Sequence, residues 1–448
     1  MKNILNKFIA YFKENKHLEE VLKGSVIALL GKIIGMISVY LYIYIISNKF
    51  GAYELGIFTL SITVLNILSI IPKFGFENAI LKVVAELTAF NKSKELPELI
   101  FKSAFLTFSI AFLFGFILYF QSKNISTFIF GKSNMEKPLK IIGLILPFFS
   151  VLGVFAAFFR GMKKTIPYVL FNSALISILF LLLLVTSFLL NINISLLYLY
   201  FATVLIVFCI ALMRFIKGLN KLKVETNKTK YSFSKLLNIT LPLLFASSFT
   251  MLMNWSDIII LGVMRSEEEV GVYIAAFKIA TLTSVVLFSF NTIIAPKFAE
   301  LHANNNKLEL QKIVQQTTRL IFATSIPLLI IFCFFPKYIL GFLGEEFLSA
   351  SYVLIILTFG QLINSLCGSV GLLMQMIGKE KVYQKIILLS LILNITLNLI
   401  LIPVYGAIGA AIASMISLIT WNTISTIYVK KTTGISTFIT LKTIPLNE

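Results

Sequence analysis

The chain has 448 residues, of which 58% are hydrophobic and 13% charged, and its mean hydropathy is +0.92. About a quarter of the residues of a soluble domain are charged, so this composition excludes an ordinary water-exposed protein. The net charge of +19 comes from basic residues spread over many short polar segments, which argues against a nucleic-acid-binding face and favours contact with anionic lipid. Composition therefore predicts a membrane protein.

Apolar segments recur along the whole chain. A helix needs roughly 20 apolar residues to cross the hydrocarbon layer, and the first segment is too long for a secretory signal and lacks a small-residue cleavage site. The predicted fold is an all-α polytopic membrane protein with about 12 transmembrane helices. The expected spans are residues 24–47, 55–72, 101–121, 139–159, 167–190, 194–216, 236–263, 270–296, 317–335, 350–377, 383–403 and 406–429.

The basic residues are distributed unequally between the two sides of these spans. Most of the 39 Lys and Arg lie near the termini or in the connections that parity puts on the same side. Cytoplasmic loops are enriched in Lys and Arg, so we expect a multi-pass protein of the cell membrane with both termini in the cytoplasm. The connection 122–138 argues against this orientation, because it lies outside by parity and carries Lys123, Lys132 and Lys137.

The chain divides at its most polar stretch. Residues 217–235 predict a cytoplasmic linker between an N-terminal lobe, residues 1–216, and a C-terminal lobe, residues 236–448. Each lobe would hold six spans. The expected architecture is therefore two six-helix lobes around a central cleft.

Short strings of the first half recur in the second at a nearly constant offset. GIF from Gly56 recurs as GVY from Gly271, and GMKK from Gly161 recurs as GKEK from Gly378. An even number of spans separates the copies, so they have the same orientation. We therefore expect the lobes to be related by an axis along the membrane normal, with the substrate site at their interface.

Several strings resemble one known family. NWSDIIILG from Asn254, VGVY from Val270 and AAFKIA from Ala275 resemble the polysaccharide transporter (Wzx-type O-antigen flippase) family. GFENA from Gly75 and the segment 393–411 extend the likeness over nearly the whole chain. This family shares a superfamily with the multidrug and toxic compound extrusion (MATE) transporters and the lipid II flippases.

The resemblance implies a MATE-like fold and export of an undecaprenyl-diphosphate-linked oligosaccharide from the inner to the outer leaflet, without ATP, for surface polysaccharide biosynthesis. Its implied partners are the lipid-linked saccharide, the bilayer and polysaccharide assembly proteins. One alternative is a multidrug exporter of organic cations from the same superfamily. Another is a membrane-embedded saccharide polymerase or glycosyltransferase, but such an enzyme needs a large loop with catalytic carboxylates, and residues 217–235 contain only Glu225.

Charged side chains inside spans are costly and are therefore candidates for function. At 1.5 Å per residue, Lys32 lies about 12 Å below the cytoplasmic face and Lys278 about 12 Å below the outer face. Asp257 is level with Lys278 on the preceding helix. We expect both lysines to bind the diphosphate, and Asp257 to pair with Lys278 and act in gating or coupling. The alternatives are a structural ion pair for Asp257 and Lys278 and an interfacial position for Lys32.

Other polar residues are weaker candidates. Glu77 follows Pro72 and begins an amphipathic stretch, so it either gates or couples transport or is a helix-start carboxylate. Arg160, at a cytoplasmic helix end, is expected to be an interfacial anchor, with a substrate ligand as the alternative. Amides in spans can bind sugar hydroxyls or a neighbouring helix. The four candidate sugar contacts are Asn66, Asn254, Asn291 and Asn364.

The sequence indicates no cofactor and no metal site. The string GKS from Gly131 matches the last three residues of a P-loop. The first glycine of that motif is missing, because Ser126 occupies its position. The two histidines, His17 and His302, lie outside the spans. The cysteines fall inside spans without metal-binding spacing, and we expect no disulfide. They are Cys209, Cys333 and Cys367.

Overall fold

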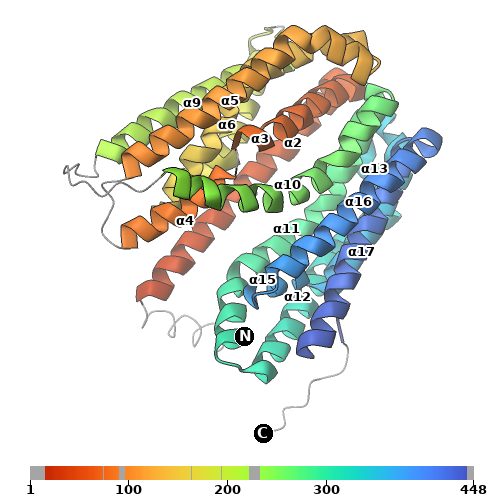
Figure 1. Ribbon diagram of the computed structural model, residues 1–448. Coiled ribbons are helices and arrows are strands. Elements are labelled where there is room, and N and C mark those ends of the chain that lie inside the picture. Colours follow the sequence, from red (N-terminus) through yellow and green to blue (C-terminus); the bar gives the residue numbers. More distant parts are fainter. Residues whose placement is uncertain are drawn as a thin grey trace.

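Two groups of helices form the molecule, and they lie together at one end and diverge toward the other (Figure 1). All regular structure is helical in the part of the chain that the computed structural model describes, which is residues 16–73, 75–89, 96–162, 164–192, 194–220 and 233–440. Lobe 1 consists of α2 (Lys16–Leu68), α3 (Ile70–Lys73), α4 (Phe76–Ala89), α5 (Leu96–Asn124), α6 (Glu136–Gly161), α7 (Thr165–Val169), α8 (Leu175–Leu189) and α9 (Leu196–Asn220).

The second group follows a helix that crosses between the lobes, α10 (Phe233–Met264), which packs against α2 and α4 of lobe 1 and against α16 of lobe 2. Lobe 2 consists of α11 (Glu267–Ala303), α12 (Lys307–Phe334), α13 (Pro336–Gly341), α14 (Ser351–Cys367), α15 (Val370–Met376), α16 (Glu380–Tyr405) and α17 (Ala407–Thr433). Much of the expected linker 217–235 lies outside the described residues, so the division into 1–216 and 236–448 stays a prediction.

The long helix α2 is a hairpin of two spans. Gly51 has φ 81° and ψ 179°, a backbone conformation that favours glycine. The rings of Tyr42 and Phe58 are 6.1 Å apart, whereas residues 16 positions apart in a straight helix would be separated by about 24 Å. The chain therefore turns back at Gly51.

The number of spans agrees with the sequence prediction. Nine helices of the described residues are long and apolar enough to cross a membrane, and the pair Thr165–Asn172 and Leu175–Leu189, bent by 53°, makes up to ten. The α2 hairpin adds one more span, and α10, which contributes the shorter apolar stretch Met251–Met264, adds another. All the predicted segments lie in helices, which confirms the all-α polytopic fold of about twelve spans.

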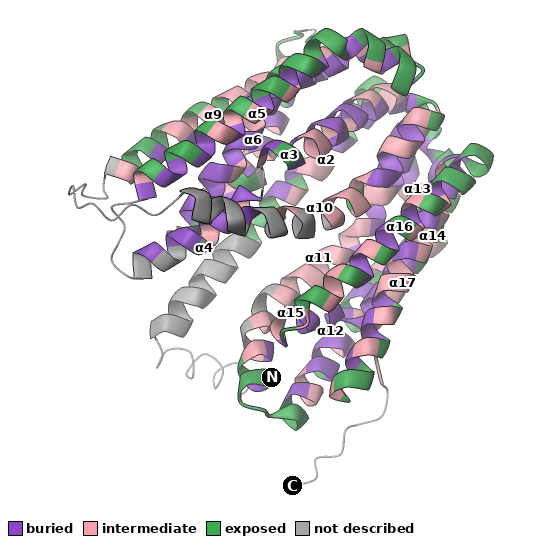
Figure 2. Ribbon diagram, in the orientation of Figure 1, coloured by how far each residue is buried: buried purple, intermediate pink, exposed green. Residues whose placement is uncertain are grey.

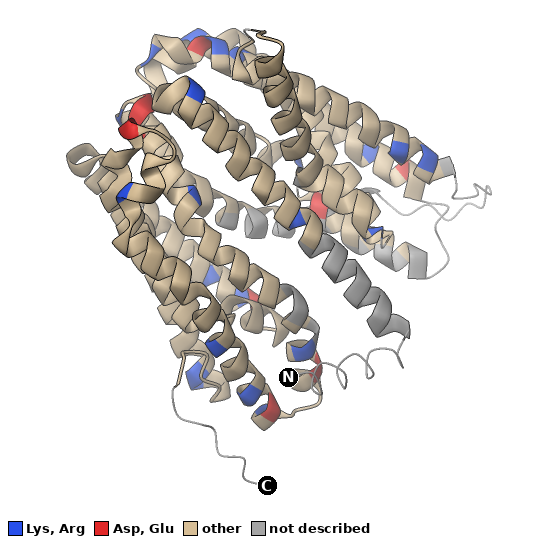
Figure 3. Cartoon of the chain, turned by 180° about the vertical axis from the view of Figure 1, so that it is seen from behind, with Lys and Arg blue, Asp and Glu red and all other residues tan. Residues whose placement is uncertain are grey.

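The outer surface of both lobes suits contact with lipid. Exposed residues lie mainly on the sides of the helices that face away from the other helices, and uncharged residues cover most of the helix lengths (Figures 2 and 3). Helix α5 illustrates this surface, because a row of phenylalanines at helical spacing remains exposed along it. These are Phe101, Phe105, Phe112, Phe116 and Phe120.

The lobes meet most closely where α2 packs against α11. A Cβ on Gly56 would overlap the carbonyl group of Glu267, and a Cβ on Gly271 would overlap that of Ala52. Each carbonyl belongs to the residue four positions before the other glycine, so the contact is reciprocal, as between parts related by a two-fold axis. Gly56 and Gly271 are also equivalent in the sequence repeat. The contact therefore supports the predicted two-fold relation between the lobes.

Polar contacts join the lobes near this same end, which we call the distal end; the opposite end, at the α11–α12 turn, is the proximal end. The backbone N–H of Ala52 donates to Glu346 (2.6 Å), and Asn48 donates to the Phe342 carbonyl (2.9 Å). Glu267 pairs with Lys132 (3.5 Å) and accepts from Asn134 (2.8 Å). The lobes are therefore closed at the distal end, while Figure 1 shows the helices apart at the proximal end.

We predict that Gly56→Ala and Gly271→Ala each destabilise the protein by roughly 1–3 kcal/mol, because the added methyl group forces the two helices apart. The matched control is Gly341→Ala, where an added Cβ would lie 3.7 Å from Leu348, an ordinary contact. The unfolding temperature of purified protein in detergent measures the effect. Equal unfolding temperatures for all three variants would contradict the close contact.

Candidate functional site

A cavity of about 660 Å³ lies between the lobes in the proximal half. Lobe 1 contributes Lys32 from α2 and Arg160 from the last turn of α6. Lobe 2 contributes side chains from α11, α16 and α17 and from the break between α14 and α15. Among the described residues, two cations and no carboxylate line this cavity, so it attracts anions.

Lys32 faces this cavity, as predicted, and reaches across it. Its ammonium nitrogen lies 3.0 Å from the centroid of the Phe288 ring on α11, a cation–π contact that links the two lobes. No carboxylate in the part of the chain that the structure describes forms an ion pair with Lys32. The charge is therefore available to a bound anion.

Arg160 also lines the cavity, which favours the ligand over the interfacial anchor, and its role stays a prediction. The guanidinium lies 5.1 Å from the centroid of the Tyr168 ring, and both side chains line the cavity. A planar guanidinium group can bind two phosphate oxygens through parallel hydrogen bonds. The position of Arg160 at a helix end did not indicate that it lines a cavity. Lys32 and Arg160 together form the cationic wall of the cavity.

Lys278 lies farther toward the distal end. Its backbone carbonyl accepts a hydrogen bond from the Tyr40 hydroxyl (2.9 Å), and Tyr40 is eight residues, or about 12 Å, beyond Lys32 along α2. The Lys278 ammonium lies 6.0 Å from the centroid of the Trp255 ring, and Lys278 is absent from the lining of the cavity. A role in binding the diphosphate stays a prediction.

The predicted ion pair between Asp257 and Lys278 is wrong. The Asp257 carboxylate accepts hydrogen bonds from Tyr273 (2.9 Å), Asn398 (2.7 Å) and Ser414, and none of the ion pairs among the described residues joins it to Lys278. The sequence gives the depth of a residue in the membrane but not the direction of its side chain. The Asp257 carboxylate instead contacts α11, α16 and α17, and Lys278 is absent from the lining of its pocket.

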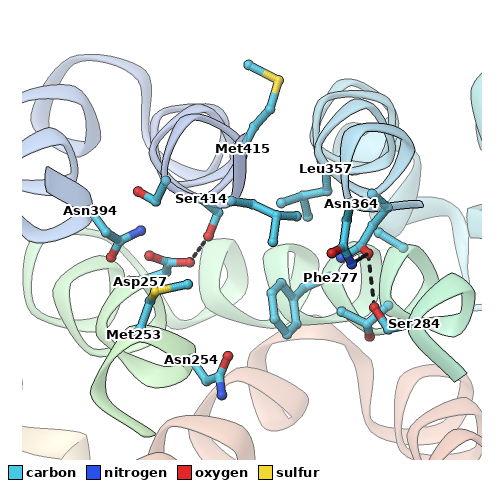
Figure 4. A pocket seen from close by; sticks show the side chains of 15 residues that line it. Met253, Asn254, Asp257, Phe277, Ser284, Leu357, Asn364, Asn394, Ser414 and Met415 are labelled. Atoms are coloured by element: carbon cyan, nitrogen blue, oxygen red, sulfur yellow. Dashed lines mark hydrogen bonds between the residues drawn. The ribbon is translucent and has the colours of Figure 1, made fainter. Parts of the chain in front are cut away.

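Asp257 lies in a second pocket, of about 180 Å³, inside lobe 2 (Figure 4). Only 2% of its surface is exposed, and its partners are neutral donors, so no cation in the described residues compensates the carboxylate. Ser284 donates to Gln361 (2.9 Å) at the other side of the pocket. The pocket therefore suits a proton or a small monovalent cation, because burial of an unpaired carboxylate is unfavourable.

The asparagines proposed as sugar contacts lie in three different places. Asn291 lines the cavity between the lobes. Asn254 and Asn364 line the pocket of Asp257 instead. Asn66 lines neither, and its amide donates to the Ile62 carbonyl one turn earlier (2.8 Å). Of these four asparagines, Asn291 alone lies in the cavity of the cationic wall.

Glu77 is neutralised within lobe 1. Its carboxylate pairs with Lys73 (2.9 Å) and lies against Gly153, where a Cβ would overlap it. The helix breaks at Gly75, with φ 71°, rather than at Pro72, and a Cβ on Gly75 would lie 2.8 Å from a backbone nitrogen of α10. A gating role for Glu77 stays a prediction.

Several cavity residues escaped the sequence analysis because they are neither charged nor amides. Ser369 enters the wall through the break between α14 and α15 at Gly368, which has φ 62°. Trp421 and Tyr383 come from α17 and α16. The glycine at 368, inside a predicted span, was the one signal that could have indicated a break.

The sequence matches known protein families along most of its length. The family model described as "Polysaccharide biosynthesis protein" matches residues 21–302, and the MatE model matches residues 242–400. A probable low-salt glycan biosynthesis flippase of Haloferax volcanii is 26% identical over 202 residues, which cover 45% of this chain and 43% of that protein. Capsular polysaccharide biosynthesis protein CapF of Staphylococcus aureus is 25% identical over 232 residues, covering 52% and 58%. The chain thus spans about half the length of these curated relatives.

Solved structures share the fold. The lipid II flippase MurJ in an inward closed conformation has a TM-score of 0.72 at 17% identity and covers 91% of this chain and 87% of that chain. An inward-facing multidrug resistance MATE transporter has a TM-score of 0.70 at 12% identity, covering 92% and 98%. These similarities establish the two-lobed MATE-like fold.

Proposed function

Because the chain belongs to the polysaccharide biosynthesis protein family, we propose that it is a flippase for a saccharide carried on a polyprenyl diphosphate such as undecaprenyl diphosphate. The saccharide moves from the inner to the outer leaflet of the cell membrane by alternating access and supplies surface polysaccharide biosynthesis. Relatives whose names include a glycan biosynthesis flippase and a capsular polysaccharide biosynthesis protein support this substrate class.

The observation that carries the proposal is the charge of the cavity between the lobes. A diphosphate is a dense anion, and Lys32 and Arg160 provide an ammonium and a guanidinium that no described carboxylate neutralises. Each bound phosphate oxygen accepts a charge-assisted hydrogen bond, which is stronger than a hydrogen bond between neutral groups. Lys278, on α11 and farther toward the distal end, is the third cation that the diphosphate meets on its way out.

The same charge argues against a multidrug exporter of organic cations. Such an exporter needs a cavity that attracts cations, and two positive side chains in the wall repel them. The acidic group, Asp257, lies in the smaller pocket inside lobe 2 and is enclosed by hydrogen-bond donors. We propose that this pocket couples transport to a proton or a monovalent cation, with Glu77 as the second candidate.

We predict that Lys32→Ala and Arg160→Ala each lower the flipping rate roughly 10- to 100-fold, the factor for the loss of one hydrogen bond to a charged group. Lys32→Arg keeps the charge and should retain more activity. Lys102→Ala is the control, because Lys102 forms an exposed ion pair with Glu98 on the surface of α5 (2.7 Å) and such pairs contribute little.

The flipping assay follows the amount of lipid-linked saccharide that stays in the inner leaflet, together with the level of the protein in the membrane. Full activity of Lys32→Ala and Arg160→Ala at a normal protein level would show that these charges have a structural role. The diphosphate mechanism would then have to be abandoned.

Coupling is tested with Asp257→Asn, which keeps the side-chain size and removes the charge. In proteoliposomes with an imposed proton or sodium gradient, we expect this variant to flip substrate at a rate that no longer depends on the gradient. Glu77→Gln is the matched variant and should keep the dependence, because Lys73 already neutralises Glu77. A gradient response that survives in Asp257→Asn and disappears in Glu77→Gln would assign coupling to Glu77 instead.

Orientation is tested with single cysteines in a protein that lacks Cys209, Cys333 and Cys367. We propose that the proximal end faces the cytoplasm, together with both termini. A membrane-impermeant maleimide added to intact cells should label Asn191→Cys, at the distal end after α8, and should label Asn304→Cys, in the α11–α12 turn, only after permeabilisation. The opposite pattern would reverse the orientation and the direction of transport.

A further inference from the structure

The cavity between the lobes has two chemically different walls. Lobe 1 contributes both cations, Lys32 and Arg160, and beside them Tyr168 and Asn172. Lobe 2 contributes neutral hydrogen-bonding and aromatic side chains, which include Asn291, Ser369 and Trp421. A diphosphate uses only the first wall, so the second is free for the part of the substrate that is attached to the diphosphate.

Three buried polar atoms in the lobe 2 wall have no hydrogen-bond partner among the described residues. They are the side-chain carbonyl oxygen of Asn291, the hydroxyl of Ser369 and the indole nitrogen of Trp421. Ser369 is only 6% exposed. A buried polar group without a partner is unfavourable, and such groups are rare in folded proteins. Together they provide an acceptor, a hydroxyl that can donate or accept, and a donor.

The aromatic side chains of this wall are held in place by their neighbours. The rings of Tyr383 and Trp421 meet edge to face, with centroids 6.1 Å apart and planes at 79°. A Cβ on Gly371 would lie 3.1 Å from the Tyr383 ring, so this glycine permits the ring to pack closely. An indole or phenol group presents an apolar face and a polar tip, and sugar rings present the complementary combination of C–H faces and hydroxyl edges.

The position of Ser369 is fixed by the chain on the other side of the wall. A Cβ on Gly368 would overlap the side chain of Thr318 on α12, and the Thr318 hydroxyl donates to the Thr437 carbonyl (3.1 Å). The Ile439 N–H donates to the Leu366 carbonyl at the end of α14 (3.0 Å). The break that places Ser369 in the cavity wall is therefore a defined element of structure.

We infer that the lobe 2 wall of the cavity is a carbohydrate-binding subsite, in which Asn291, Ser369 and Trp421 bind hydroxyl or amide groups of the sugar nearest to the diphosphate. This inference rests on the proposed flippase function and deepens it. The lobe 1 wall then binds every polyprenyl diphosphate alike. The lobe 2 wall distinguishes a diphosphate that carries a sugar from one that does not.

The test compares two probes with the purified full-length protein in lipid nanodiscs. One is a polyprenyl diphosphate without sugar, and the other is the same lipid with one N-acetylhexosamine attached. We expect Ser369→Ala and Trp421→Phe to weaken binding of the saccharide probe roughly 3- to 10-fold, the factor for one neutral hydrogen bond, and to leave binding of the bare diphosphate unchanged. Lys32→Ala should weaken binding of both probes.

Ser390→Ala is the matched control for Ser369→Ala. The Ser390 hydroxyl is also buried and without a partner among the described residues, but it lies outside the cavity. A second readout uses Trp255→Phe, which leaves Trp421 as the only one of the two tryptophans. Its fluorescence should change with the saccharide probe and much less with the bare diphosphate, and a purely structural Trp421 would show no such difference.

The outcomes separate this inference from the proposed function. If the wild-type protein binds both probes equally, or if Ser369→Ala and Trp421→Phe keep the preference for the saccharide probe, the subsite is absent while the flippase proposal stands. If the wild-type protein binds neither probe, the flippase proposal fails, and the inference fails with it.

Discussion

An ionised side chain inside a membrane needs water or a partner, and this requirement shapes the whole molecule. A lysine at the centre of a bilayer costs about 2.5–3.5 kcal/mol on insertion scales. Lys32 has no carboxylate partner among the described residues and faces the space between the lobes, where it contacts an aromatic ring of the opposite lobe. A cavity that admits water makes this position tolerable. The distal contacts join the lobes at the other end. In this conformation the cavity with the cationic wall is therefore present while the distal end is closed.

Two sites of opposite charge share one helix. The cavity between the lobes uses Phe288 and Asn291 of α11, and the pocket of Asp257 uses Thr281 and Ser284 of the same helix. This helix also packs against α2 where the two lobes meet most closely. In the proposed coupling, a change of charge at Asp257 acts through this helix on the position of the lobes.

The sequence predicted what depends on hydropathy and spacing. The apolar segments predicted the spans, the repeated glycines predicted two related lobes, and the rarity of charge inside spans identified Lys32 as a candidate. It did not predict the partners of Asp257, because depth along a helix says nothing about rotation around it. Asp257 and Lys278 are level, and yet Asp257 binds Tyr273, Asn398 and Ser414.

Arg160 and Trp421 show a second limit of the sequence. Arg160 lies at a helix end and Trp421 lies in an apolar helix. Neither position in the sequence indicates that the side chain lines a cavity. Their place in the cavity wall depends on how far the lobes diverge and on the break at Gly368, which are properties of the assembled fold. Residues that line a space between two lobes are found only when both lobes are in place.

The central claim is that the cavity recognises a diphosphate. The most direct measurement is the affinity of the purified wild-type protein for three lipids of equal chain length: a polyprenyl diphosphate, the monophosphate and the uncharged alcohol. This account predicts that the diphosphate binds most tightly and the alcohol most weakly, with the difference shrinking at high salt as the charges are screened. Equal affinity for the three lipids, or tighter binding of a lipophilic cation, would contradict it.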